Sequence, residues 1–278
     1  MPINENFLAA AARAFDPGMG TEHVGPLLYA LLRMHRPRRA LAIGLGYSTL
    51  FLLQALADNE AEARRDAAVI AGAADDPLRR EVLHPQYPHA GHRGRLHGID
   101  DFSDDPGRLD QFLGCVEHLG LQAYFSLERC RYQDAALARA PDGFDFMWMD
   151  CGHQLDYAPL LNRFWPLLDD DGGLLAMHYT YVDIDAEDEH GGKHKVMMPG
   201  PFINTVRQQL LQAGLQANFE TLSLIEPHKH RQGSVSLLRK LDDGECCRPS
   251  SLASEQSLLY GEPGEPLAPL TERAEEMD

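Results

Sequence analysis

The sequence has little that would suit a membrane protein or a nucleic-acid binder. No stretch approaches the roughly 20 consecutive apolar residues that a bilayer-spanning helix needs. The first 15 residues lack the charged segment that precedes the apolar part of a secretory signal. Basic residues are scarce, with 25 lysines and arginines against 42 acids and a net charge of −17. Because phosphate-backbone binding depends on clustered Lys and Arg, we expect a cytoplasmic protein with no nucleic-acid or membrane partner.

Cysteine is also rare and widely spaced. The chain has five cysteines, an odd number, and only Cys246 and Cys247 are close in sequence. No CxxC spacing is present, which argues against a disulfide framework and against a cysteine-based metal or redox site. We expect reduced thiols.

What the chain does contain is a regular alternation of strand and helix patterns. Short apolar runs at "RRALAIGLG", "RLHGIDDF", "AYFSLER", "FDFMWMD" and "LLAMHYT" are separated by segments with helical spacing. Strands that are apolar throughout are typical of a parallel sheet covered on both faces. After an acidic loop and another helix, residues 218 to 240 predict an antiparallel hairpin. The predicted fold is therefore α/β, a Rossmann-like, doubly wound and mostly parallel sheet with a C-terminal antiparallel hairpin.

Composition divides the chain into three regions. Residues 1 to 38 predict two helices, which form an N-terminal helical cap. Residues 39 to 241 hold the main domain, with an insertion at 59 to 95 that is rich in Ala, Asp, Arg, His and Pro and predicts a helix followed by an irregular loop. Residues 242 to 278 contain ten acids and two arginines, which predicts an acidic, flexible tail.

The turn after the first predicted strand reads "AIGLGYST", residues 42 to 49. Two glycines one residue apart are weak evidence of a ligand, because many strand-to-helix turns need glycine. The third glycine of the dinucleotide fingerprint is missing, and so is the Gly-Lys-Ser/Thr of a P-loop. Both of those phosphate sites are therefore disfavoured.

Three motifs taken in order resemble the class I S-adenosylmethionine-dependent methyltransferases, particularly their small-molecule, O-methyltransferase-like branch. In that family E-I-G-x-G-Y-S-T follows the first strand, G-[IV]-D the second and D-G-x-H the fourth. Here these motifs are "AIGLGYST", "GIDDF" (98 to 102) and "DCGH" (150 to 153). The resemblance covers about residues 39 to 240. It implies a seven-stranded sheet, S-adenosyl-L-methionine as cofactor and an enzyme that transfers a methyl group.

The same resemblance assigns a cofactor pocket to the carboxyl ends of the strands. Glycines let the backbone approach the cofactor, hydroxyls at the start of the following helix hold its carboxylate, and Asp100 accepts the ribose hydroxyls. For Asp100 and Asp101 the alternative is an ordinary turn, and for Arg131 and Tyr132 a solvated loop. The predicted cofactor-binding residues are Gly44, Gly46, Tyr47, Ser48, Thr49, Asp100, Asp101, Arg131, Tyr132, Asp150, Cys151 and Gly152.

Three residues near the predicted sheet edge are candidates for catalysis. His153 and His178 are candidate general bases, because an imidazole has an ordinary pKa near 6.5. Tyr179 is a candidate for lining the pocket or facing the sulfonium through its ring. The structural alternatives are a helix cap or backbone hydrogen bond for His153 and simple packing for Tyr179.

The sequence departs from the family pattern at two positions. Ala42 replaces the acid that holds the cofactor's ammonium group in relatives, and Tyr179 stands where some relatives have a metal-binding acid. Asp150 with one or two imidazoles is a poor donor set for magnesium, which prefers carboxylate and water oxygens. We therefore expect no metal in the site.

Three functions remain open at this stage. The first is methyl transfer to an oxygen or nitrogen of a small molecule, and the acid run at residues 183 to 189 raises the option of a cationic acceptor. The second is a lyase on the same fold that cyclises the cofactor and releases methylthioadenosine, because Ala42 leaves the ammonium without its acid. The third is a non-catalytic cofactor-binding partner protein. The family resemblance also raises the option of a homodimer.

Overall fold

The structure of the chain is a computed structural model that describes most of its residues. The described ranges are 3 to 84, 87 to 103, 105 to 137, 143 to 151, 157 to 181, 184 to 187, 191 to 196, 198 to 214, 218 to 229 and 234 to 241. Gly152, His153 and the predicted tail at 242 to 278 lie outside these ranges. Within them, every helix is too short or too polar to cross a bilayer.

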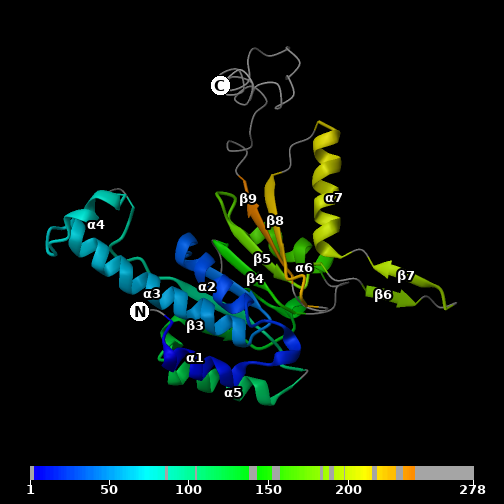
Figure 1. Ribbon diagram of the computed structural model, residues 1–278, viewed down its shortest axis with the longest axis horizontal. Helices are drawn as coiled ribbons and strands as arrows, with labels where there is room; N and C mark the ends of the chain where they lie inside the picture. The colour runs from blue at the N-terminus through cyan, green and yellow to red at the C-terminus, as the bar shows by residue number, and fades with distance from the viewer. Residues whose placement is uncertain are drawn as a thin grey trace, which may run out of the picture.

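A seven-stranded sheet with the order β3-β2-β1-β4-β5-β9-β8 forms the centre of the molecule (Figure 1). Adjacent strands among β1 to β5 pair in parallel, whereas β9 runs antiparallel to both β5 and β8. The predicted doubly wound sheet with its C-terminal hairpin is confirmed. The strands are β1 (Arg39–Ile43), β2 (Arg95–Ile99), β3 (Phe125–Glu128), β4 (Phe146–Met149), β5 (Leu174–His178), β8 (Phe219–Ile225) and β9 (Ser234–Lys240).

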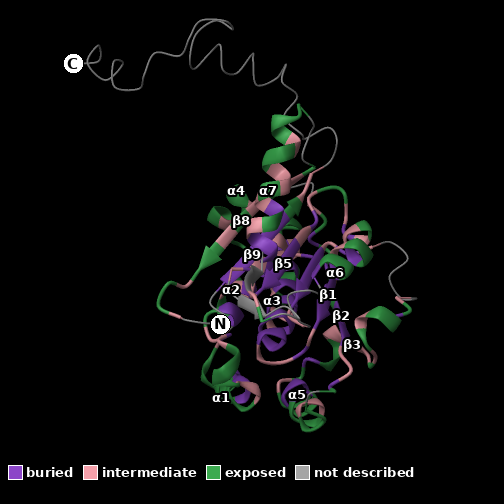
Figure 2. Ribbon diagram, turned by 90° about the vertical axis from the view of Figure 1, so that its right-hand side faces the viewer, coloured by how far each residue is buried: buried purple, intermediate pink, exposed green. Residues whose placement is uncertain are grey.

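Helices cover both faces of this sheet. Side chains of α1, α2, α3 and α5 share one apolar cluster with the sheet, and those of α6 and α7 share the other. Figure 2 shows the buried strands between these layers. The helices are α1 (Glu5–Ala11), α2 (Val24–His35), α3 (Tyr47–Ile70), α4 (Pro77–Val82), α5 (Gly107–His118), α6 (Tyr157–Phe164) and α7 (Pro199–Gln212).

A row of small residues flanks one large side chain in the middle of the sheet. Ala42 pairs in register with Gly98 on one side and with Trp148 on the other, and Trp148 pairs with Ala176. The side chains of Ala42, Trp148 and Ala176 are fully buried in the same cluster. Because Ala42 and Ala176 are small, they leave space in the sheet layer for the indole of Trp148, and the core stays closely packed. Ala42 is thus a core residue of β1.

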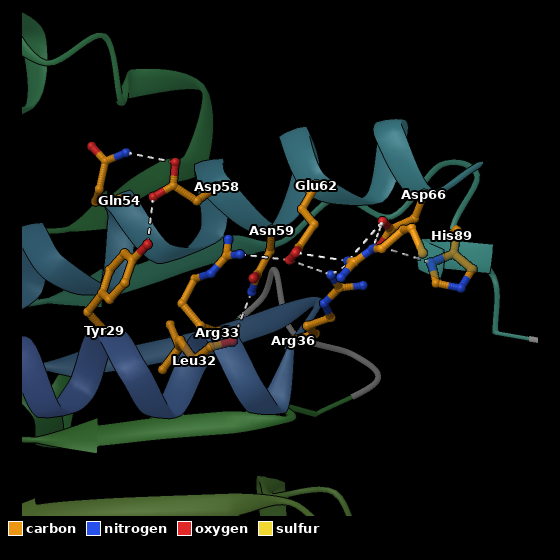
Figure 3. Close-up of polar contacts among 11 residues, drawn as sticks. Tyr29, Leu32, Arg33, Arg36, Gln54, Asp58, Asn59, Glu62, Asp66 and His89 are labelled. Carbon is orange, nitrogen blue, oxygen red and sulfur yellow. Dashed lines mark hydrogen bonds and ion pairs between the residues drawn. The ribbon is translucent and has the colours of Figure 1, made fainter. Parts of the chain in front are cut away.

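Helix α3 is a single element of 24 residues, so it passes without a break through residue 59, where the predicted insertion begins. Arginines of α2 fix its second half: Arg33 and Arg36 contact the carboxylate of Glu62 at 2.7 and 2.6 Å (Figure 3). Arg79, from α4, contacts Asp66 at 2.9 Å. These long-range ion pairs extend the helix beyond the apolar run that predicted it.

The predicted loop after β5 contains a second, two-stranded sheet, and the loop prediction is wrong at this point. Strands β6 (Ile184–Glu187) and β7 (Lys193–Val196) pair antiparallel. Their register sets Asp185 opposite Lys195 and Glu187 opposite Lys193. Apolar and charged residues alternate along β6, which is a strand pattern that the run of acids conceals.

Candidate functional site

The turn that follows β1 is packed against the ends of two neighbouring strands. The amide of Gly44 donates to the carbonyl of Ile99 at 3.0 Å, and the amide of Asp150 donates to the carbonyl of Ile43 at 2.8 Å. Gly44 has φ +85°, and a Cβ there would lie 2.0 Å from the carbonyl oxygen of Asp150. Only glycine fits this position, since both the backbone angle and the close approach exclude a side chain.

Asp100 at the end of β2 holds this turn in place. Its carboxylate accepts hydrogen bonds from the amide of Leu45 at 2.7 Å and from the amide of Phe102 at 2.7 Å. Burial raises the pKa of Asp100, and these two hydrogen bonds offset the effect only in part. Each carboxylate oxygen has a second lone pair, so a ligand hydroxyl is still able to donate to it. Asp100 therefore supports the turn from the end of β2, and its side chain lies outside the residues that line the pocket.

Its neighbour Asp101 points elsewhere. The carboxylate of Asp101 accepts from the amide and hydroxyl of Ser103 and lies 3.5 Å from Nε of Arg131, whose side chain is 71% exposed. Hydrogen bonds from Ser103 and the charge of Arg131 lower the pKa of Asp101 despite a small opposing effect of burial. The structure thus separates Asp101 and Arg131 from Asp100, although they follow neighbouring strands.

Helix α3 begins at this turn with a local cap. The amide of Gly46 donates to Oγ1 of Thr49 at 3.3 Å, and the amide of Thr49 donates back to the carbonyl of Gly46 at 3.1 Å. Thr49 is fully buried and lies outside the pocket lining, so its side chain shapes the turn. Ser48 does line the pocket. The first amides of a helix have no carbonyl partner within it and favour an anion in front of them.

A pocket opens in front of this helix start, at the carboxyl ends of β1 and β4. Gly46 faces its space, because the nearest atom to a Cβ there would be Nη2 of Arg108 at 3.6 Å. The turn brings together five of the predicted residues: Gly44, Gly46, Tyr47, Ser48 and Asp150. The wall opposite comes from the N-terminal cap and consists of Ala14, Asp16, Met19 and Thr21.

Arg108 and the cap residues are functional candidates that the sequence did not reveal. Arg108, in the first turn of α5, donates from Nη2 to the carbonyl of Leu45 at 2.8 Å and lines the pocket. No motif surrounds Arg108 in the sequence. Its role follows only from the packing of α5 beside the turn, which local sequence patterns do not encode.

A buried imidazole and a carboxylate form a pair beside the pocket. Nδ1 of His178 lies 2.8 Å from Oδ1 of Asp150, and Oδ2 of Asp150 accepts from the hydroxyl of Ser48 at 3.4 Å. The phenol of Tyr157 donates to the carbonyl of His178, and the deep burial of this phenol raises its pKa well above the usual value. The side chain of His178 is 2% exposed, so its ring is rigidly held.

The other described residues of the prediction, Tyr179, Tyr132 and Cys151, make separate contacts. Tyr179 has φ +61°, a left-handed angle that is uncommon for a tyrosine, and its amide donates to the carbonyl of Ser234 at 2.9 Å. Tyr132 packs beside Phe164 with ring centroids 6.5 Å apart. Cys151 is half-buried next to Gly44.

The donor atoms that the structure describes at this edge do not fit a magnesium ion. Among the described residues, Asp150 is the one pocket carboxylate that follows a strand, and an imidazole and a hydroxyl already contact it. Strand β5 ends at His178 and is followed by Tyr179, and neither residue offers a carboxylate. A hard cation requires more carboxylate oxygens than this set provides.

Comparison with known proteins connects the fold with solved structures. No family model matches the chain, and no curated protein matches it. Among solved structures, the O-methyltransferase TomG of Streptomyces achromogenes, in complex with SAM, has a TM-score of 0.52 at 16% identity, covering 86% of this chain and 91% of TomG. The O-methyltransferase of Bacillus cereus, in complex with SAH, has a TM-score of 0.51 at 12% identity, covering 86% and 92%. The fold is that of these methyltransferases.

Proposed function

We propose that this chain is an S-adenosylmethionine-dependent methyltransferase that acts on an oxygen or nitrogen of a small molecule without a metal ion. The observation that carries the proposal is the pocket at the carboxyl ends of β1 and β4, where Gly46 and the start of α3 face open space. Ligands of open α/β sheets bind outside the carboxyl ends of the strands. The fold shared with SAM-bound TomG gives this pocket a specific candidate ligand.

The pocket offers complementary groups for each part of the cofactor. The start of α3, with Ser48, suits the carboxylate. Asp100 lies outside the pocket lining, at the end of β2, and its remaining lone pairs suit a ribose that extends toward that strand. Ala42 is buried in the core, so a carboxylate for the ammonium group must come from the lining, where Asp16 and Asp150 are the acids. The bound cofactor supplies an activated methyl group, and the chain supplies orientation and a base.

We assign the base to His178. Asp150 holds the imidazole through Nδ1 and so fixes the orientation of the ring, as a carboxylate does for a catalytic histidine. The buried setting keeps the ring in one orientation. An acceptor hydroxyl or amine that gives up its proton here becomes the nucleophile for methyl transfer.

Calorimetry with S-adenosylmethionine tests the pocket directly. We expect the wild-type chain to bind, and Gly46→Val to weaken binding by more than about tenfold, which corresponds to about 1.4 kcal/mol. A Cβ at this position meets only Nη2 of Arg108, at 3.6 Å, which is an ordinary van der Waals contact, so the substitution adds its bulk at the pocket lining. Gly114→Val is the matched control, since Gly114 is exposed on α5 with nothing within 4 Å. Equal binding by the wild type and Gly46→Val would refute the proposed pocket.

Product analysis separates methyl transfer from the other two functions. A methyltransferase releases S-adenosylhomocysteine only when an acceptor is present. Methylthioadenosine formed without an acceptor would identify a lyase. Tight binding with no product across varied acceptors would identify a binding protein.

A further inference from the structure

Two segments about 200 residues apart meet at the surface beside the pocket wall. His23 precedes α2, and Glu226 and His228 belong to the turn that follows β8. Nδ1 of His23 contacts Oε1 of Glu226, and Nε2 of His228 lies 3.9 Å from the same oxygen. The three ligand atoms all lie within 4.8 Å of one another.

We propose that His23, Glu226 and His228 form a site for a divalent transition-metal ion, with zinc as the best-fitting candidate, which fastens the N-terminal cap to the β8–β9 hairpin. Imidazole nitrogens and a carboxylate oxygen are typical zinc ligands, with bonds of about 2.0 to 2.2 Å. Atoms at that distance from one ion lie roughly 3 to 4 Å apart, so small side-chain rotations complete the geometry. The two imidazoles favour zinc, copper or nickel over magnesium and calcium.

The backbone around the three ligands is already fixed. The amide of Lys229 donates to the carbonyl of Glu226 at 3.1 Å, which closes the turn that carries Glu226 and His228. The ammonium of Lys229 contacts Oε2 of Glu226 at 2.6 Å, Oε1 of Glu22 at 2.9 Å and the carbonyl of Gly20 at 3.0 Å. Lys229 therefore holds one oxygen of Glu226 and joins the cap to the hairpin, which leaves the other oxygen directed at the histidines.

Both histidine side chains are 63% exposed, so an ion reaches the site directly from solvent. Three protein ligands leave a fourth tetrahedral position for water, which makes the site exchangeable. The segment it fastens ends two residues after Thr21, which lines the pocket together with Asp16 and Met19. A bound ion would thus hold one wall of the pocket in place, whichever ligand the pocket takes.

Zinc binding by the untagged, chelator-treated full chain tests this site. The probe is zinc sulfate, titrated in competition with a chromophoric chelator. We expect one zinc ion per chain, and a loss of more than about 100-fold in affinity for His23→Ala and for His228→Ala, because removal of even a supporting residue costs 10 to 100-fold. His118→Ala is the matched control, since His118 is an exposed histidine on α5, away from this cluster.

A second measurement tests whether zinc holds the N-terminal cap against the β8–β9 hairpin. Amide hydrogen exchange of residues 16 to 23 and 219 to 229 should slow on zinc addition in the wild type and stay unchanged in His23→Ala. Because His23 is exposed, its removal leaves the core intact, and an unchanged thermal midpoint without zinc verifies this. Zinc affinity that is the same in all variants, or binding that leaves both segments unprotected, would overturn the proposal.

Discussion

At the scale of single residues, the conformation of the turn after β1 requires glycine at position 44 but not at position 46. Gly44 is confined by its backbone angle and by the Asp150 carbonyl, whereas Gly46 has an extended backbone and open space in front of it. The two glycines therefore have different reasons to be glycine. Gly44 serves the protein's own packing, and Gly46 leaves room for a ligand.

Gly44→Ala should lower the free energy of unfolding by about 2 to 5 kcal/mol. The left-handed angle alone costs about 1 to 2 kcal/mol, and the contact with Asp150 adds about 1 to 3 kcal/mol of overpacking. Gly72→Ala is the control, because it has a similar angle, φ +71°, with nothing within 4 Å. Urea denaturation measures both variants, and equal losses would show that the contact with Asp150 is unimportant.

His178→Gln should reduce the rate of methyl transfer by about 10² to 10⁴-fold while the affinity for S-adenosylmethionine stays within about twofold. Loss of a base slows the proton transfer and leaves the cofactor contacts in place. His97→Gln is a matched control, because His97 also pairs with a carboxylate, Glu128 at 3.1 Å, but on β2. Initial rates with a working acceptor and calorimetry make the comparison. A His178→Gln variant with full activity would remove the base from the mechanism.

At the scale of elements, the arginine and acid network of α2, α3 and α4 determines how far α3 extends (Figure 3). The side chain of Asp66 is 2% exposed and contacts Arg79 at 2.9 Å and Arg36 at 3.4 Å. Burial acts to raise the pKa of Asp66, but the hydrogen bonds and charges of the two arginines outweigh it and lower that pKa. At Glu62, too, burial acts to raise the pKa, but the contacts with arginines outweigh it, so the pKa of Glu62 is also lowered.

The lowered pKa of Asp66 makes stability depend on pH in a defined direction. The stabilisation that ionised Asp66 provides is complete above the pKa of an aspartate in the unfolded chain, about 3.9. It is lost as the pH falls through the lower pKa that Asp66 has in the folded chain. Asp66→Asn should cost about 2 to 3 kcal/mol at pH 7, the size of a charged hydrogen bond, and should reduce the loss of stability below about pH 4. Asp110→Asn, at an exposed acid of α5, is the control. Urea denaturation from pH 3 to 7 measures the free energy of unfolding of both variants and of the wild type. If this free energy has the same pH dependence in Asp66→Asn as in the wild type, Asp66 is not the source of the pH dependence.

The elements also show what the sequence was able to predict. The central strands β1, β4 and β5 were predictable because they are buried on both faces and therefore almost entirely apolar. The helix after residue 59 was predicted as a separate element, but its continuity with the first half of α3 was not, because arginines 13 to 30 residues away in sequence stabilise it. The same limit applies to the site. The glycine turn has a local signature, but Arg108 and the cap wall reach the pocket only through packing.

At the scale of the whole molecule, the net charge of −17 acts against the compact state. Salt screens this repulsion, and the screening length falls from about 30 Å at 0.01 M to about 10 Å at 0.1 M. We expect the thermal midpoint to rise by about 2 °C between these concentrations, which corresponds to an effect of about 1 kcal/mol. Differential scanning calorimetry measures the shift. A midpoint that falls with salt would mean that ion pairs such as those of α3 outweigh the net repulsion.

The contact between Lys229 and Gly20, 209 residues apart, sets an order for folding during synthesis. The ribosome releases the cap first, but the residue that fastens it lies close to the end of the domain. Strand β9 is also the last strand in the part of the chain that the structure describes, yet it fits between β5 and β8. The pocket wall formed by the cap therefore stays unfastened until the hairpin has emerged and folded. A chain stopped before residue 229 would carry the complete glycine turn without a secured wall in front of it.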